Sequence, residues 1–426
     1  MAAIFGKRSA IENADFMAGH FSPGDSGGTN SGSGFEGRGT FSPWDVMLTL
    51  EGCTAFAGAS VRKLESKNVG VMAFPFCVRP SGVGYGSSDL SDEPNSRAEI
   101  WMPLWRQPAT FASISHLFSE GRIQVGLRQA RTGVDFVRAI SSVGVDRGIT
   151  SFQRFGFQKR NGDNHYAVPL GRYEVGGAST NAALISQLDS WLDRFRRAAA
   201  GDLAPAAAES ALRQLESAIM TACQRDDSSS ALQMLIALGQ ANAAIASSPS
   251  IRDADYPVPP VPLLGREWLH RCYDDSRGAV EFRLAASLAS LGHWSGLRVD
   301  DRPRYDPVGP LRRHIEPIVW EEMLSERMRG KNRRAFWASP AEDPAVVWTG
   351  ADIVRNLNAV LNRRIVEAIS AGEGDLFAPF DGRCAASLAD VNRFIERTVD
   401  DRLIEKYLLA LMLIDWPVVR AQDIPW

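Results

Sequence analysis

Residues 151–175 read SFQRFGFQKRNGDNHYAVPLGRYEV, and this stretch decides the fold class of the first part of the chain. Two runs rich in aromatic and β-branched residues flank Asn161-Gly162, a dipeptide that favours the tight turn of a β-hairpin. Upstream, VMAFPFCVR at 71–79 and EIWMPLW at 99–105 are short β-like runs. Their prolines favour edge positions or breaks. The first part of the chain is therefore predicted to contain antiparallel strands.

Helical patterns surround these strands. Apolar spacing predicts helices over 43–58 and 111–143, and beyond about residue 180 the chain reads as mostly helical. There, LISQLDSWLDRFRRA at 184–198 aligns its large apolar residues on one helical face, namely Leu184, Leu188, Trp191, Leu192 and Phe195. Further helices are predicted at 204–223, 229–247, 279–291, 311–329, 350–370, 387–397 and 401–414. At the start of 387–397, Ser387 and Asp390 form a variant capping box.

These patterns divide the chain into two regions. We predict an α+β region over 1–178, which contains a glycine-rich N-terminal segment, and a mostly α-helical region, a helical bundle, over 179–426. YPVPPVPLL at 256–264 predicts a proline-rich connector inside the second region. The length of 426 residues suits two or three domains of ordinary size.

The composition narrows the functional classes. The formal net charge of −3 excludes a globally basic nucleic-acid binder. The five cysteines are scattered and form no CxxC pair, which argues against a zinc ribbon or a disulfide framework and fits a reducing cytoplasm. The sequence contains neither a secretory signal nor an apolar run long enough for a membrane helix. We therefore expect a cytoplasmic protein that does not engage a membrane.

The motifs for catalysis and metal binding are incomplete. The histidines show no HxxxH or HxH spacing, so neither a metal site nor an HD-type nuclease is predicted. GDSGG at 24–28 matches the segment around the nucleophile of trypsin-like proteases, but that chemistry needs a histidine base and a buried aspartate, and only His20 precedes Ser26. We expect no catalytic residue, no metal and no cofactor. A serine hydrolase that uses Ser26 is the alternative hypothesis.

A glycine-rich loop, RPSGVGYG at 79–86, follows the first β-like run. Glycines let the backbone approach a phosphate, and Arg79 would supply positive charge. The loop is neither a Walker A motif, because no Gly-Lys-Ser/Thr follows, nor a GxGxxG fingerprint, because position 87 is Ser. A plain surface loop and a contact to a nucleic-acid backbone both stay open.

Two stretches are rich in basic residues. Aromatic residues interleave with arginine and lysine in 122–172, and a second basic stretch covers 302–334. Single strands and heteroduplexes are bound by such side chains, although a solvated helix face has the same composition. Together with Arg79, the candidate nucleic-acid contacts are Arg122, Arg128, Arg131, Arg138, Arg154, Lys159, Arg160, Arg312, Arg313, Lys331, Arg333 and Arg334.

Several long segments together resemble one family. About residues 21–172 contain, in order, HFSPGDSGGTNSGSGFEGRG, SPWDVMLTLEGCTAFAGASVRKL, FPFCVRPSGVGYGSSD, AEIWMPLW, EGRIQVGLRQARTGVDFVRAISSVGVDRGITSFQRFGF and YAVPLGRY. A second matching stretch, 384–416, contains SLADVNRFIERTVDDRLIEKYLLALMLIDW. Both stretches resemble the large subunit of the type I-G (formerly I-U) CRISPR Cascade effector complex.

The resemblance implies a non-catalytic subunit of a crRNA-guided surveillance complex in antiviral defence. Such a subunit would help to recognise the target duplex, hold the opened DNA strands of the R-loop and recruit the helicase-nuclease, while base pairing reads the sequence. The implied partners are crRNA, target DNA and the other Cascade subunits, which form the backbone and process the crRNA. Family members carry a long region ahead of the glycine-rich segment, so this chain is expected to lack the usual N-terminal region. A scaffold that touches only other protein subunits is the third hypothesis.

Overall fold

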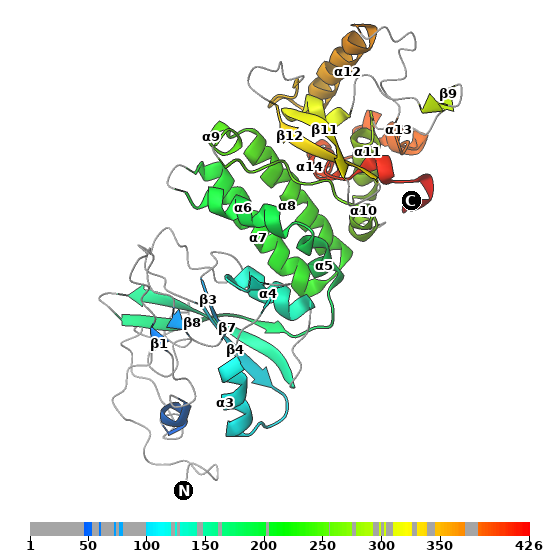
Figure 1. Cartoon of the computed structure of the whole chain (residues 1–426). Helices are drawn as coiled ribbons and strands as arrows, with labels where there is room; N and C mark the ends of the chain where they lie inside the picture. Colours follow the sequence, from blue (N-terminus) through cyan, green and yellow to red (C-terminus); the bar gives the residue numbers. More distant parts are fainter. Residues whose placement is uncertain are drawn as a thin grey trace. The chain divides into compact units, whose positions relative to one another are not determined.

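The computed structural model (Figure 1) divides the chain into two compact units, Met1–Ala182 and Ala183–Trp426, called here the first and second unit. It describes residues 47–52, 59–60, 72–73, 76–79, 99–120, 124–125, 128–142, 148–160, 164–201, 204–254, 256–274, 278–292, 298–299, 302–303, 310–325, 330–338, 346–370 and 382–426. Helices predominate over small antiparallel sheets, which confirms the predicted mixture of helix and strand. The predicted glycine-rich segment and Ser26 lie outside the described residues.

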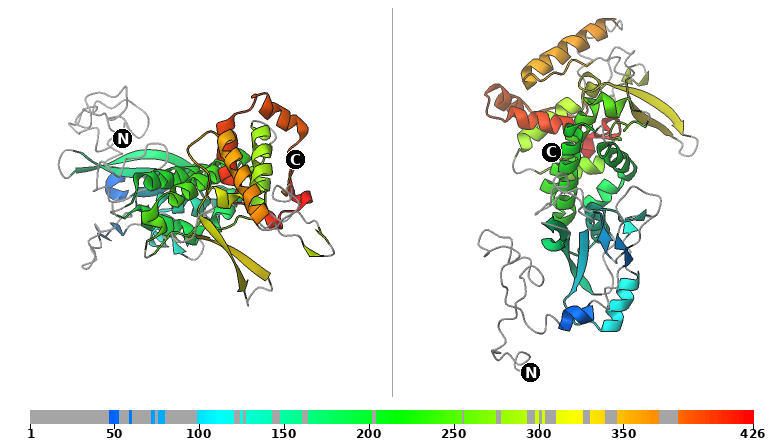
Figure 2. Two further views of the ribbon diagram at one scale, coloured as in Figure 1. Left: turned by 90° about the horizontal axis from the view of Figure 1, so that it is seen from above. Right: turned by 90° about the vertical axis from the view of Figure 1, so that its left-hand side faces the viewer.

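A four-stranded antiparallel sheet forms the centre of the first unit (Figures 1 and 2). Its strands, in spatial order, are β3 (Cys77–Val78), β4 (Glu99–Trp105), β7 (Ile149–Arg160) and β8 (Asn164–Glu174). β7 and β8 pair as far as Arg160 opposite Asn164, which confirms the predicted hairpin. The other described pairs of this unit are β1 (Ala59–Ser60) with β2 (Met72–Ala73) and β5 (Gln124–Val125) with β6 (Arg128–Gln129).

β4 is an interior strand, although its proline favours an edge. β3 pairs only with Glu99 and Ile100. At Pro103 the neighbouring strand among the described residues is therefore β7 alone, through Phe152. A residue without an N–H is tolerated where one side of a strand has no partner. The expected edge position is therefore wrong for β4 as a whole, but at Pro103 itself the strand has a described partner on one side alone.

The segment 111–143 is not the single helix that its pattern predicts. It contains two helices, α3 (Phe111–Glu120) and α4 (Gly133–Ser142), with β5 and β6 between them. Glycines at 121, 126 and 133 divide the segment, and glycine is unfavourable inside a helix. α4 is buried from Gly133 to Ser141, so it is a core helix of the first unit.

Aromatic rings fill this core. Trp101 of β4 stacks on Phe136 of α4 with 4.5 Å between ring centroids, and Phe152 of β7 meets Phe136 edge to face at 5.1 Å. Phe76 makes edge-to-face contacts with Phe118 and Phe152, although its φ of +58° is rare for a bulky residue. Burial of these rings removes large apolar areas from water. The aromatic core therefore joins the two central strands and α4 to the segment that enters β3.

The second unit is built around helix α8 (Ser228–Ala246). This helix is buried on most sides and packs against α7 (Ala206–Arg225), α10 (Arg266–Cys272) and α14 (Asp401–Leu411). Further helices that lie wholly or partly in this unit are α5 (Thr180–Ser186), α6 (Asp189–Ala199), α9 (Pro249–Arg252), α11 (Ala279–Ala289), α12 (Ile353–Ser370) and α13 (Leu388–Ile395). No helix of the described residues combines the length and hydrophobicity needed to cross a membrane.

The pattern at 184–198 correctly predicts which residues of one helical face are buried, but it wrongly predicts one continuous helix. All five apolar residues predicted for that face are buried, but a break at 187–188 separates α5 from α6. The helices predicted at 204–223, 229–247, 279–291, 350–370, 387–397 and 401–414 correspond to α7, α8, α11, α12, α13 and α14. The short helices α9 and α10 were not predicted, because neither is long enough to show a clear period.

The prediction of a helix over 311–329 is wrong. The structure has a single 3-10 turn, η2 (Leu311–His314), and then a strand, β11 (Ile318–Ser325), paired with β12 (Gly330–Trp337). Pro317 blocks helix continuation, and Ile318-Val319-Trp320 is a β-branched and aromatic run that favours a strand. The second unit therefore contains strands, including the short pair β9 (Arg298–Val299) with β10 (Arg302–Pro303).

The proline-rich connector at 256–264 is part of the core. Val258, Val261 and Leu264 are buried. The indole N–H of Trp191 donates to the carbonyl of Pro259 at 2.9 Å, and that of Trp337 donates to the carbonyl of Val258 at 2.7 Å. Proline has no backbone N–H, so a proline-rich segment can donate few backbone hydrogen bonds of its own. Here the two tryptophan indoles bond the carbonyls of the segment, and these bonds fix the connector in place.

Candidate nucleic-acid interface

The fold removes three of the predicted nucleic-acid contacts from the surface. Arg138, Arg154 and Arg312 are each at most 2% exposed. Arg154 donates to Glu99 from Nε at 2.9 Å and from Nη2 at 2.5 Å, and Arg312 donates from Nε to Glu316 at 2.8 Å. Guanidiniums that neutralise buried carboxylates do not reach an external phosphate. These three assignments are therefore corrected to structural roles.

Arg154 illustrates the electrostatics of such a site. Burial disfavours its charged form, but the hydrogen bond and Coulomb attraction from Glu99 outweigh this cost and raise the pKa of the guanidinium. Its Cζ also lies 5.8 Å from the ring centroid of Trp101, which adds a cation–π contact. Arg154 thus stays charged inside the first unit.

For several other predicted contacts the structure gives only a backbone position. Arg122 lies outside the described residues. Arg128 is in β6, Lys159 and Arg160 are at the end of β7, and Lys331, Arg333 and Arg334 are in β12. The last three therefore belong to a strand. Arg313 is half-buried in η2, where its Nη2 lies 3.4 Å from a carboxylate oxygen of Glu367.

Arg79 and Arg131 are the predicted contacts that the fold brings together at the surface. The N–H of Arg79 donates to the carbonyl of Arg131 at 2.9 Å, and Arg79 forms a parallel bridge with Thr132. Both side chains are exposed. Among the described residues, neither guanidinium has a carboxylate partner. Two exposed cations from distant parts of the sequence thus lie at neighbouring backbone positions, with Arg79 opposite Thr132 and Arg131 one residue before it.

The start of α4 holds Arg131 in position. Thr132 Oγ1 accepts the N–H of Asp135 at 3.3 Å, and Asp135 Oδ2 accepts the N–H of Arg131 at 3.2 Å. The other oxygen of the buried Asp135 lies 3.8 Å from Nη1 of Arg138. Because this buried pair is neutral overall, the charge that the group presents to solvent is that of Arg79 and Arg131.

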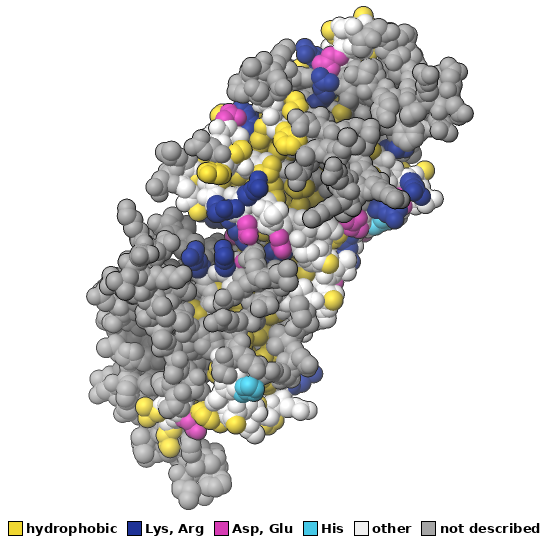
Figure 3. Space-filling view, in the orientation of Figure 1, with side chains coloured by type: hydrophobic (Ala, Val, Ile, Leu, Met, Phe, Trp, Pro, Cys, Tyr) yellow, Lys and Arg dark blue, Asp and Glu magenta, His cyan; other side chains and the backbone are white. Residues whose placement is uncertain are grey.

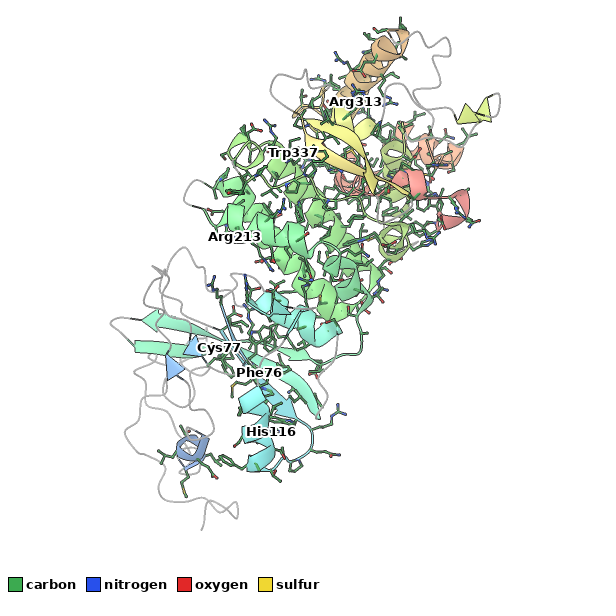
Figure 4. All side chains as sticks on the ribbon, viewed as in Figure 1. Phe76, Cys77, His116, Arg213, Arg313 and Trp337 are labelled. Carbon is green, nitrogen blue, oxygen red and sulfur yellow. The ribbon has the colours of Figure 1, made fainter. Side chains whose placement is uncertain are left out.

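β3 holds Arg79 in position. Figure 4 shows Phe76 and Cys77 at the sheet, and these residues lead directly into Val78 and Arg79. Val78 is buried and pairs with Glu99 of β4. Both arginines therefore extend from backbone that the sheet, the aromatic core and α4 keep fixed. A fixed backbone lowers the conformational entropy lost when a ligand binds.

Other exposed cations of the described residues are spread over several elements. On the face drawn in Figure 3, lysine and arginine side chains lie in several small groups and not in one continuous patch. Arg172 of β8 is 55% exposed, and its Nε lies 3.2 Å from a carboxylate oxygen of Glu174. An exposed cation with an acidic neighbour has a weaker field at the surface than an unpaired one. Arg79 and Arg131 are thus the better candidates in the first unit.

The described cysteines and possible metal ligands are candidate catalytic groups. Burial raises the pKa of Cys77 and of Cys384 to about 11, and it raises the pKa of Cys272 as well. These thiols are protonated at neutral pH and are poor nucleophiles. No group of three metal-ligating side chains lies together within the part of the chain that the structure describes.

No protein-family model matches the chain, and no curated protein matches it at a significant level. The resemblance to the type I-G large subunit therefore stays a prediction from the sequence. The pairing of Arg79 with Arg131 was not predicted, because the bridge that joins them is a tertiary contact. The Thr132–Asp135 spacing before an apolar helix was its one local signal, since it is typical of a helix start.

Proposed function

We propose that this chain is a non-catalytic subunit of a crRNA-guided surveillance complex, which binds the backbone of target DNA or crRNA and stabilises the opened strands. An α+β region followed by a mostly helical region is the arrangement that we propose for it. The exposed, neighbouring Arg79 and Arg131 are the observation that supports phosphate binding. The resemblance at 21–172 and 384–416 supports the kind of complex and its partners.

The chemistry of the guanidinium group supports this proposal. Each guanidinium can donate two parallel N–H hydrogen bonds to phosphate oxygens. Arg79 and Arg131 are exposed and come from backbones joined by a hydrogen bond, so each offers a phosphate contact in the same part of the first unit. Contacts of this kind are independent of base sequence and weaken as salt is added. They fit a subunit that holds strands while base pairing supplies specificity.

The double substitution Arg79→Glu, Arg131→Glu tests the proposal. We expect it to weaken binding of single-stranded DNA and of an RNA–DNA duplex by the chain, alone and assembled with its Cascade partners. The slope of log affinity against log salt should fall by about 1.4–1.8 units, because each of the two lost phosphate contacts removes roughly 0.7–0.9. Fluorescence anisotropy over a salt series measures both quantities.

Arg172→Glu is the matched control, because Arg172 is an exposed arginine of the same unit that already has an acidic neighbour. It should leave the salt slope within about half a unit of wild type. If the double variant keeps the affinity and salt slope of the unaltered chain, the phosphate-binding proposal is wrong. A chain that binds no nucleic acid yet still assembles with the other subunits would instead support the scaffold hypothesis.

A further inference from the structure

A cavity of about 530 Å³ lies in the second unit, where the end of α8, the residues after η2, the segment 346–349 and α14 meet. Its size is within the range of about 300–1,000 Å³ typical of small-molecule sites. Most of the wall is apolar and includes Ile315, Pro317 and Leu409. The indole of Trp348 and the carboxylates of Glu316 and Glu405 also line it.

Glu316 is neutralised from within the protein. It is 2% exposed, its Oε1 accepts the side-chain N–H of Asn242 at 2.6 Å, and its Oε2 accepts Nε–H of Arg312 at 2.8 Å. Both carboxylate oxygens are thus occupied, and a cationic partner balances the charge. Glu316 shapes the wall of the cavity without adding net charge to it.

Glu405 has no such balance. Its Oε1 accepts the indole N–H of Trp348 at 3.3 Å, and no cation pairs with it among the residues that the structure describes. Ala243 and Ala246, from the last turn of α8, also line the cavity. The carbonyl of Ala246 at the end of α8 already accepts Nη1–H of Arg252 at 3.0 Å, so this helix end adds no free negative charge. The cavity therefore combines an aromatic ring with one carboxylate that has no cationic partner among the described residues.

Trp348 is held in place before any ligand arrives. The N–H groups of Val347 and Trp348 donate to the carbonyl of His314 at 3.0 and 3.1 Å. The buried side chain of Asn356 accepts the N–H of Thr349 at 3.0 Å and donates to the carbonyl of Thr349 at 3.2 Å. These bonds fix the segment on both sides of the indole, so binding would order few groups.

We propose that this cavity binds an organic cation, with a guanidinium or ammonium head group on a short alkyl arm. Glu405 attracts and hydrogen-bonds the head group, the Trp348 ring adds a cation–π contact, and the apolar wall takes the alkyl arm. The ligand has the opposite sign to a phosphate, so the site is independent of the proposed nucleic-acid interface. The cation can come from a free amine or from an arginine or lysine side chain of a partner polypeptide.

Agmatine is the probe for the test, and the indole N–H signal of Trp348 in a nitrogen–proton NMR spectrum is the readout. The signal is assigned by its absence in Trp348→Phe. We expect saturable movement of this signal with agmatine, and none with the neutral analogue 1-pentanol. Glu405→Gln keeps the side-chain shape and an acceptor for Trp348 but removes the charge. It should weaken agmatine binding about tenfold, the usual scale for a charge-assisted hydrogen bond.

Glu396→Gln is the control, because Glu396 is an exposed carboxylate of the same unit that does not line the cavity. It should bind agmatine like the unaltered chain. The peptide acetyl-Gly-Arg-Gly-amide forms the second arm: binding at least as tight as that of agmatine identifies a partner side chain as the source, and weaker binding identifies a free amine. Failure of both probes to move the signal, or unchanged affinity in Glu405→Gln, would overturn the proposal.

Discussion

Arg154 and Glu99 show how one buried ion pair changes the meaning of a basic residue. Trp101 and Arg154 are opposite one another on β4 and β7, and both are fully buried. The guanidinium of Arg154 lies over the indole and donates two hydrogen bonds to the carboxylate of Glu99. The basic stretch predicted Arg154 as a nucleic-acid contact, but its charge is already compensated by Glu99. Arg154 therefore stabilises the core of the first unit.

Removing one member of this pair should be costly. We expect Arg154→Met to destabilise the first unit by about 3–5 kcal/mol, because Glu99 would stay buried without its cation. Chemical denaturation followed by tryptophan fluorescence measures the loss. Glu99→Gln combined with Arg154→Met should recover part of it. Equal stability of Arg154→Met and the unaltered chain would contradict the structural role of Arg154.

At the scale of the element, the start of α13 shows which part of a helix-capping motif the sequence predicts and which part depends on a neighbouring helix. Ser387 Oγ accepts the N–H of Asp390 at 3.0 Å, which confirms half of the predicted capping box. The other half differs, because the carboxylate of Asp390 accepts two hydrogen bonds from Arg283 of α11, at 2.9 and 2.7 Å. The local motif therefore becomes a link between α13 and α11.

Gly239 sets the distance between α8 and α14. A Cβ at this position would lie 2.9 Å from backbone atoms of Leu409 and Ala410, so the helices would have to move apart. Gly239→Ala should gain up to about 1 kcal/mol of helix propensity but lose about 1–3 kcal/mol from overpacking. We expect a net loss of stability in thermal unfolding. Gln233→Ala, at an exposed position of the same helix, should be tolerated; a Gly239→Ala variant more stable than wild type would refute the close approach.

At the scale of the molecule, acid should act on the second unit through its paired aspartates. Hydrogen bonds from Arg283 lower the pKa of Asp390, the hydrogen bonds of Ser230 lower that of Asp227, and the backbone of Arg420 lowers that of Asp423. Because the folded pKa values lie below the unfolded value of about 3.9, the unfolded chain binds more protons as the pH falls.

This stabilisation is therefore present at neutral pH and is lost as the pH falls through about 4 and below. We expect the midpoint of thermal unfolding to drop in that window. Asp390→Asn should lower the midpoint at neutral pH and flatten its dependence on acid, as followed by circular dichroism. The same acid dependence in Asp390→Asn and the unaltered chain would show that Asp390 does not contribute.

The sequence by itself determined the local features of this protein. Asn161-Gly162 between aromatic runs is enough for the β7–β8 hairpin, and the apolar periods are enough for α7, α8, α11, α12, α13 and α14, because turn chemistry and helical spacing act over a few residues. Pro317 and the β-branched residues after it were the local signal for β11, which the helix prediction over 311–329 overlooked.

Only the tertiary structure decided which charged residues are available to a ligand. Burial and pairing depend on residues far apart in the chain, such as Glu99 for Arg154 and Glu316 with Asn242 for the cavity wall. The same long-range contacts bring Arg79 beside Arg131 and Trp348 beside Glu405. A local pattern does not carry this information, since the free energy of a charge is set by whatever the fold places around it.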